Sequence, residues 1–169
     1  DMLGNVHEWC GDWYDRKLSG GRDPHGSRKG EDRVDRGGSW DDRARSCRAA
    51  FRYGRPPGDR GYNLGFRVCL SPAQKTAPSP RVQEKPRVED VSRGSRAGEE
   101  REYGGMRFVW CPPGRFIMGS PKGEEGRFDH EDQVRVTLSK GFWLGKYEVT
   151  QEEWERVMGT SLREQNAKS

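Results

Sequence analysis

The sequence has no apolar segment that could cross a bilayer, and it has little aliphatic material of any kind. Hydrophobic residues make up 30% of the 169 residues, whereas 34% are charged. No apolar run approaches the ~18 residues of a membrane-spanning helix. Burial therefore has to be concentrated in the six Trp, six Phe and five Tyr residues, while 23 Gly and 10 Pro predict turns and loops in place of long helices.

Other patterns are also missing, and each absence argues against a class of function. The four cysteines show no CxxC spacing, which argues against a zinc site or a thioredoxin-like pair. Their redox state stays open, and a Cys10–Cys47 disulfide requires Cα atoms within about 7 Å.

The net charge of +4 is spread among alternating acids and bases, so no nucleic-acid surface is predicted. No signal segment opens the chain, and its localisation is unknown.

The most informative stretch is Arg36-Gly37-Gly38-Ser39-Trp40, which is followed later by Asn63-Leu64-Gly65-Phe66-Arg67-Val68. Two adjacent glycines suit a backbone that turns tightly or lies against a neighbour, because glycine takes positive φ without steric cost. The stretch predicts a structural pinch or the wall of a site. The recurring arginines between these motifs can stack on rings and pair with aspartates, and an ordinary charged surface is the alternative.

The first eight residues form a loop with oxygen donors spaced along it, from Asp1 to Glu8. Ca²⁺ takes six to eight oxygens from carboxylates and backbone carbonyls, at about 2.3–2.6 Å. Calcium is therefore the natural candidate for a bound ion. A purely structural role for the two acids is the alternative.

The composition changes over residues 73–105, where prolines, charged residues and serines replace most of the aliphatic ones. Such a segment cannot bury enough surface to offset its chain entropy, and its prolines favour extended conformations. We expect a linker here, and hence a domain boundary.

Beyond the linker, the sequence predicts several strands and one helix. Residues 106–120 read as two short strands in a hairpin around Pro-Pro-Gly. Val134–Leu138 alternates like a half-buried strand, and residues 142–147 form an aromatic strand. A capping box at Thr150 and a glycine at position 159 predict a helix between them.

Residues 1–10, 33–40 and 63–68 resemble, in order and spacing, the C-terminal part of the formylglycine-generating-enzyme (sulfatase-modifying factor) family. Motifs within residues 106–169, such as Phe-Ile-Met-Gly-Ser and Lys-Tyr-Glu-Val-Thr-Gln-Glu-Glu-Trp, resemble the N-terminal part of the same family. The order is inverted, and the family's middle segment is absent. We therefore expect an excerpt across the junction of two tandem copies.

This interpretation divides the chain into three parts. They are the C-terminal part of a first domain (1–72), a Pro-rich linker (73–105) and the N-terminal part of a second domain (106–169). The resemblance implies an α+β fold that is C-type-lectin-like, irregular and loop-rich, present here as partial domains.

The resemblance also implies a site and an activity. Side-chain oxygens of Asp1 and Glu8 and backbone carbonyls of Gly4 and Val6 would bind a structural calcium ion. The family activity is that of an oxidoreductase, which oxidises a cysteine of a protein or peptide substrate to formylglycine. His7 stands where the family usually has an aromatic residue.

The candidate catalytic residues are Ser39 and Cys47. In copper-dependent members two cysteines bind the metal, and by count from Trp40 the first position holds Asp42 and the second Cys47. A carboxylate cannot replace a thiolate in a two-coordinate Cu(I) site. We therefore expect no copper-dependent oxidation from residues 1–72, and whether the chain is an enzyme stays uncertain.

Iron is not expected either. Iron-dependent relatives, the sulfoxide synthases, take their histidine ligands from a separate helical domain, and His7, His25 and His130 do not supply a 2-His-1-carboxylate set within one copy. The alternative function is a non-catalytic, calcium-stabilised, lectin-like binding or sensor module. Residues 40–62 would then present Trp, Arg, Asp and Tyr side chains to a protein or carbohydrate ligand, and Cys47 would be structural.

Overall fold

The computed structural model describes residues 2–71, called the first segment, residues 92–161, called the second segment, and residue 164. The elements of the first segment are β1 (His7–Trp13), β2 (Gly21–Arg22), β3 (Arg33–Arg36), the 3₁₀ helix η1 (Ala44–Cys47), β4 (Tyr53–Arg55), β5 (Leu64–Gly65) and β6 (Cys69–Leu70). Those of the second segment are β7 (Glu100–Tyr103), β8 (Met106–Cys111), β9 (Gly114–Met118), β10 (Val134–Leu138), β11 (Phe142–Gly145) and α1 (Gln151–Met158).

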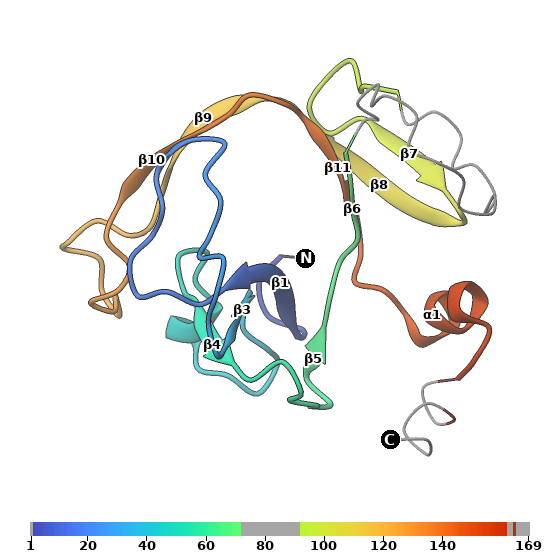
Figure 1. Ribbon diagram of the computed structural model, residues 1–169, viewed down its shortest axis with the longest axis horizontal. Coiled ribbons are helices and arrows are strands. Elements are labelled where there is room, and N and C mark those ends of the chain that lie inside the picture. Colours follow the sequence, from blue (N-terminus) through green and yellow to red (C-terminus); the bar gives the residue numbers. More distant parts are fainter. Residues whose placement is uncertain (1, 72–91, 162–163, 165–169) are drawn as a thin grey trace.

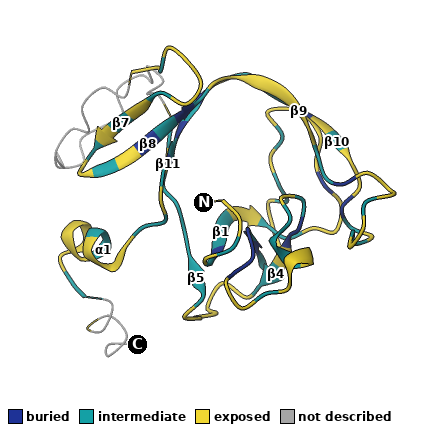
Figure 2. Cartoon of the chain, turned by 180° about the vertical axis from the view of Figure 1, so that it is seen from behind, coloured by how far each residue is buried: buried dark blue, intermediate teal, exposed yellow. Residues whose placement is uncertain are grey.

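The strands form three sheets, and two of these combine strands from both segments. The sheet β4-β3-β1-β5 belongs to the first segment alone, whereas the other two have the orders β2-β10-β9 and β6-β11-β8-β7. Strand β2 pairs in parallel with β10, and β6 pairs antiparallel with β11. In Figures 1 and 2, β9, β10 and β11 form an arch over the sheet of β1, β3 and β4. The two segments therefore share one hydrogen-bonded framework.

Further contacts between the segments lie near α1. The amide of Gly145 donates to the carbonyl of Val68 at 2.8 Å, and the amide of Val149 donates to the carbonyl of Phe66 at 3.0 Å. The ring of Phe66 meets Trp154 of α1 edge-on, with 5.9 Å between centroids. These contacts attach the helix to the end of the first segment.

The hydrophobic core is small and aromatic. Trp143 is completely buried, and it packs against Trp110 with ring centroids 5.1 Å apart. Phe108 is buried beside them, and Tyr103 meets both Phe108 and Trp143 edge-on. Aromatic rings provide much buried area per residue. The prediction that burial concentrates in aromatic residues holds for this cluster, whereas other rings, such as Trp40 and Tyr62, are exposed.

The predicted helix is confirmed together with its ends. The hydroxyl of Thr150 accepts a hydrogen bond from the backbone amide of Glu153, and the Glu153 carboxylate accepts one from the amide of Thr150. Gly159 ends α1 in the left-handed conformation, with φ of 68°. Both signals satisfy backbone groups that a helix leaves unpaired, which is why sequence alone locates them.

The predicted hairpin around Pro112 and Pro113 is wrong. Strands β8 and β9 do form there, but β8 pairs with β7 and β11, whereas β9 pairs with β10. Prolines lack a backbone N–H and cannot donate to a strand ladder. They mark the point where the chain leaves one sheet and enters another. The predicted strand Val134–Leu138 is confirmed as β10, and the predicted aromatic strand ends at Gly145.

Most of the predicted linker cannot be compared with the structure, because residues 72–91 lie outside the described residues. Within its C-terminal end, β7 pairs with β8 along its whole length. The division into two partial domains stays a prediction. The strand-rich arrangement with one α-helix is compatible with the expected α+β class.

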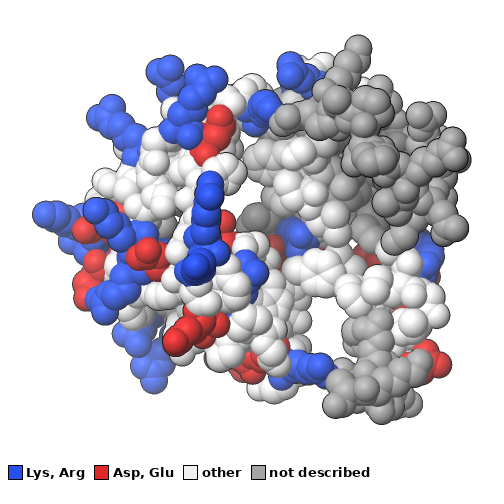
Figure 3. All heavy atoms as spheres, viewed as in Figure 1, with Lys and Arg blue, Asp and Glu red and all other residues white. Residues whose placement is uncertain are grey.

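The surface carries charges of both signs. On the face shown in Figure 3, acidic side chains lie among the Lys and Arg side chains. No helix in the described part of the chain is long and apolar enough to cross a membrane.

Candidate functional site

The two glycines after β3 adopt the tight turn that the sequence predicts. Gly37 and Gly38 have φ of 88° and 66°. A Cβ atom at Gly37 would lie 3.1 Å from the carbonyl oxygen of Met2, and one at Gly38 would lie 2.8 Å from Sγ of Cys47. Only glycine fits both the conformation and the space. The turn brings the end of β3 against η1.

His7 on β1 lies between two aspartate side chains. Its Nε2 is 2.8 Å from Oδ2 of Asp42, and its Nδ1 is 3.3 Å from Oδ1 of Asp35. The second contact does not have hydrogen-bond geometry. Arg55 holds Asp35 from the other side, since its Nε donates to Oδ2 at 2.5 Å. Because His7 and Asp35 are buried, each needs these polar neighbours.

Ser39 extends this group of contacts. Its amide donates to Oδ2 of Asp42 at 2.8 Å, and its hydroxyl lies 2.6 Å from that oxygen and 2.5 Å from Oδ1 of Asp41. Asn63 donates to Asp41 at 3.1 Å. The hydrogen bonds from Ser39 and Asn63 lower the pKa of Asp41. The side chains here called the Asp42 network are His7, Asp35, Ser39, Asp41 and Asp42.

Cys47 lies on the other side of Ser39, with its Sγ 3.7 Å from the carbonyl oxygen of Ser39. The structure thus places Ser39, Asp42 and Cys47, the residues that the sequence singled out, around one point. All four cysteines are free thiols, so the Cys10–Cys47 disulfide is not formed. With one thiol and one carboxylate, this place does not offer the soft thiolate pair that Cu(I) prefers.

The predicted calcium ligands lie next to the glycine turn. Asp1 is outside the described residues. The amide of Gly4 donates to the carbonyl of Gly37 at 2.8 Å, and Oε1 of Glu8 accepts a hydrogen bond from Arg67 at 2.8 Å. Burial raises the pKa of Glu8, although Arg67 acts to lower it. The described residues contain no group of three or more His, Cys, Asp or Glu side chains able to hold a metal. The calcium site stays a prediction.

A second polar cluster joins the two segments beside η1. The guanidinium of Arg48 contacts both carboxylate oxygens of Glu131, at 2.7 and 2.9 Å, and Oε1 of Glu124 at 2.6 Å. Ser120 donates to Glu131 at 2.9 Å. Burial acts to lower the pKa of Arg48, but the two glutamates raise it above its usual value. Sequence reasoning missed this cluster, because no local pattern links residues 83 positions apart.

An exposed aromatic pair adjoins the Asp42 network. The side chains of Trp40 and Tyr62 are 65% and 80% exposed, and their ring centroids are 5.9 Å apart. The hydroxyl of Tyr62 lies 3.3 Å from Asp41, which ties the pair to the network. Large aromatic side chains held on a surface are frequent anchors for ligands.

The chain matches the sulfatase-modifying factor enzyme 1-like domain over residues 1–72 and 95–168. It is similar to the formylglycine-generating enzyme of Streptomyces coelicolor, with 42% identity over 85 residues, which cover 47% of this chain and 27% of that enzyme.

The chain is also similar to the serine/threonine-protein kinases pkn1 of Chlamydia caviae and Chlamydia pneumoniae. Each is 39% identical over 74 residues, which cover 41% of this chain and 12% of the kinase. The aligned part thus spans only 12–27% of the length of these relatives. No solved structure matches the chain with statistical significance.

Proposed function

The chain belongs to the sulfatase-modifying factor family, and we propose that its Asp42 network serves binding and not copper-dependent oxidation. The observation that carries this proposal is the 2.8 Å contact between His7 and Asp42. By resemblance to the family, Asp42 stands at the position of the first copper-binding cysteine. Its carboxylate accepts hydrogen bonds from the Ser39 backbone and pairs with His7, so it acts as a structural anchor.

The binding surface in this proposal is the pair Trp40 and Tyr62. Asp41 connects Tyr62 to Ser39, and therefore the network fixes the loop that presents both rings. The ligand would be a protein, because Trp, Tyr and Arg side chains dominate protein recognition and the family acts on protein cysteines. Two relatives are protein kinases by name, which fits a recognition module within a larger protein.

The finer expectations belong to the same proposal. They are a C-type-lectin-like fold, a tandem arrangement of copies and a calcium site at Asp1, Gly4, Val6 and Glu8. Calcium, if bound, would stiffen the loop that precedes β1 and thus hold His7 in place. Family oxidation of a substrate cysteine to formylglycine is the second candidate. It is favoured by the 42% identity to the Streptomyces enzyme and opposed by Asp42.

Copper affinity of the full chain tests the proposal. The unaltered protein is titrated with Cu(I) against a competing chelator, beside Asp42→Cys and the matched control Asp41→Cys. We expect tight binding only for Asp42→Cys, and its loss in Asp42→Cys/Cys47→Ala. Tight binding by the unaltered protein that depends on Cys47, or aldehyde formed in a sulfatase-derived cysteine peptide, would overturn the proposal.

A further inference from the structure

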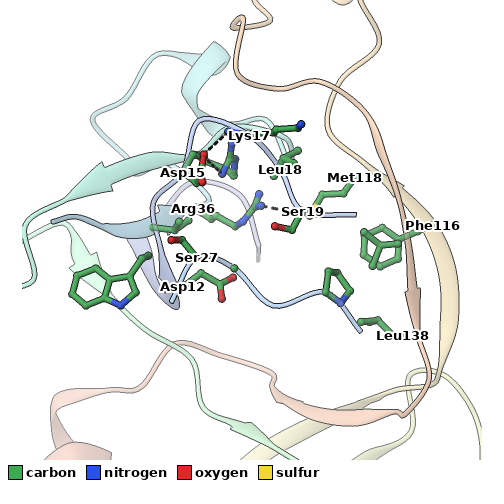
Figure 4. A pocket seen from close by; sticks show the side chains of 16 residues that line it. Asp12, Asp15, Lys17, Leu18, Ser19, Ser27, Arg36, Phe116, Met118 and Leu138 are labelled. Carbon is green, nitrogen blue, oxygen red and sulfur yellow. Dashed lines mark hydrogen bonds between the residues drawn. The ribbon is translucent and has the colours of Figure 1, made fainter. Parts of the chain in front are cut away.

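A cavity of about 210 Å³ lies where the two segments meet, between the β1–β2 connection and strands β9 and β10 (Figure 4). Its two walls differ in character. The second segment contributes the apolar side chains Phe116, Met118, Val136 and Leu138. The first segment contributes two arginines, Arg36 and Arg52, among polar residues and the apolar side chains of Trp13, Leu18, Pro24 and Val34. A cavity that combines apolar surface with two arginines suits an amphipathic anion.

Arg52 is 4% exposed and has no acidic partner in the described part of the chain. Its Nη atoms donate only to the backbone carbonyls of Asp15, Arg16 and His130, at 2.9, 3.1 and 3.1 Å. Its Nε has no hydrogen-bond partner among the described residues. Burial, and then the positive charge of Arg36, lower the pKa of Arg52. Its positive charge therefore lacks the carboxylate that buried charges usually have.

Arg36 faces the same cavity. Its Nη1 donates to the carbonyl of Ala49 at 3.2 Å, and its Nη2 lies 3.7 Å from Sδ of Met118. Figure 4 shows this side chain reaching across the cavity toward Met118. Within the described residues it forms no ion pair.

Three other half-buried arginines are paired differently. Arg48, Arg55 and Arg67 each contact two carboxylates. Arg36 and Arg52 differ from these three, because they have no carboxylate partner among the described residues.

We propose that this cavity binds a small organic carboxylate, whose acidic group pairs with Arg36 and Arg52 and whose apolar part lies on Phe116 and Leu138. Arginine suits this role because its planar fork matches a carboxylate. The acids Asp12 and Asp15 and the cation Lys17 also line the cavity, so the lining keeps an excess of one positive charge. This site is separate from the Trp40–Tyr62 surface, and the proposed protein ligand does not depend on it.

The volume limits the ligand. A water molecule occupies about 30 Å³ of liquid, so the cavity holds roughly seven groups of that size. A carboxylate with a chain of about four to six carbon atoms has a volume within this limit. Hexanoate is therefore the probe, while hexylammonium and hexanol have the same number of carbon atoms and differ from it in charge.

Calorimetric titration of the full chain with the three probes tests the proposal. We expect saturable 1:1 binding of hexanoate that weakens as salt is raised, and binding of the cation and the alcohol that is weaker by at least about tenfold. Arg36→Gln should weaken hexanoate binding by about tenfold. The matched control Arg22→Gln, on exposed β2 and outside the cavity, should bind normally.

A second variant, Phe116→Asp, tests the proposal even if Arg36→Gln fails to fold. Phe116 is 47% exposed, so Phe116→Asp should be tolerated while it removes apolar contact and repels an anion. It should abolish hexanoate binding. Equal binding of hexylammonium, no binding of hexanoate below about 10 mM, or normal binding in both variants would each overturn the proposal.

Discussion

Removing the Glu131 carboxylate should weaken the attachment of the two segments more than any exposed ion pair between them. Glu131 is fully buried and accepts from Arg48 through both oxygens. It also accepts from the hydroxyl of Ser120 at 2.9 Å. In Glu131→Ala all three contacts are lost, and Arg48 keeps Glu124 as its acidic partner.

The magnitude follows from these contacts. Removing one partner of a buried ion pair costs about 3–5 kcal/mol, because the remaining charge stays desolvated. The lower end applies here, since Glu124 still compensates Arg48. A loss of about 3 kcal/mol in the free energy of unfolding corresponds to a melting temperature lower by roughly 6–12 °C for a chain of this size.

The matched control is the pair of Arg16 and Asp129, which joins the same two segments. Their side chains are 71% and 76% exposed, and their atoms are 2.5 Å apart. Exposed pairs contribute about 0–1 kcal/mol. Urea unfolding of the full chain should therefore show a large loss for Glu131→Ala and a small one for Asp129→Ala. Equal small losses would refute the reasoning, since the segments would then not depend on this buried contact.

Two further predictions use the directions of pKa shifts. Burial acts to raise the pKa of Glu148, but hydrogen bonds, one of them from Arg67, outweigh it and lower this pKa below 4.5. The ionised form thus adds stability above that value and loses it as the pH falls through the lowered pKa. Glu148→Gln should lower the free energy of unfolding at pH 7, and this loss should shrink as the pH falls. Glu8→Gln should lower it less, because burial raises the pKa of Glu8. Unfolding measured as a function of pH checks both variants, and equal losses would contradict the argument. Burial raises the pKa of Cys10 to about 11, and it also raises the pKa of Cys69, whose side chain is nevertheless exposed. At pH 8, Cys10 should therefore alkylate more slowly than Cys69, as followed by peptide mass spectrometry. Similar rates would contradict this expectation.

The parts of the fold that the sequence predicted are those set by neighbouring residues. The capping box at Thr150 and the glycine at position 159 define α1 within one turn at each end. The alternation in residues 134–138 defines β10 in the same way. The two glycines at positions 37 and 38 predicted a close approach, which the structure shows against Met2 and Cys47.

The pairing of distant strands could not be predicted. Strands β2 and β6 have two residues each, too few for any periodicity, and both form their pairs with the other segment. Their place is set by the sheets that they join. The Arg48–Glu131 pair could not be predicted either, because a sequence rich in both charges offers many possible partners for each arginine.

The Asp42 network brings together two residues that the sequence singled out separately. By resemblance to the family, His7 would stand at the place of an aromatic residue and Asp42 at that of a copper-binding cysteine. The two residues are 35 positions apart, and their side chains are in contact at 2.8 Å. Without His7, the partly buried carboxylate of Asp42 would lose a polar partner, and without Asp42, His7 would keep only Asp35. Each side chain therefore helps to hold the other in place. This mutual contact, together with the hydrogen bond from the Ser39 amide to Asp42, is the reason why we propose that Asp42 holds the loop of Ser39 and Trp40.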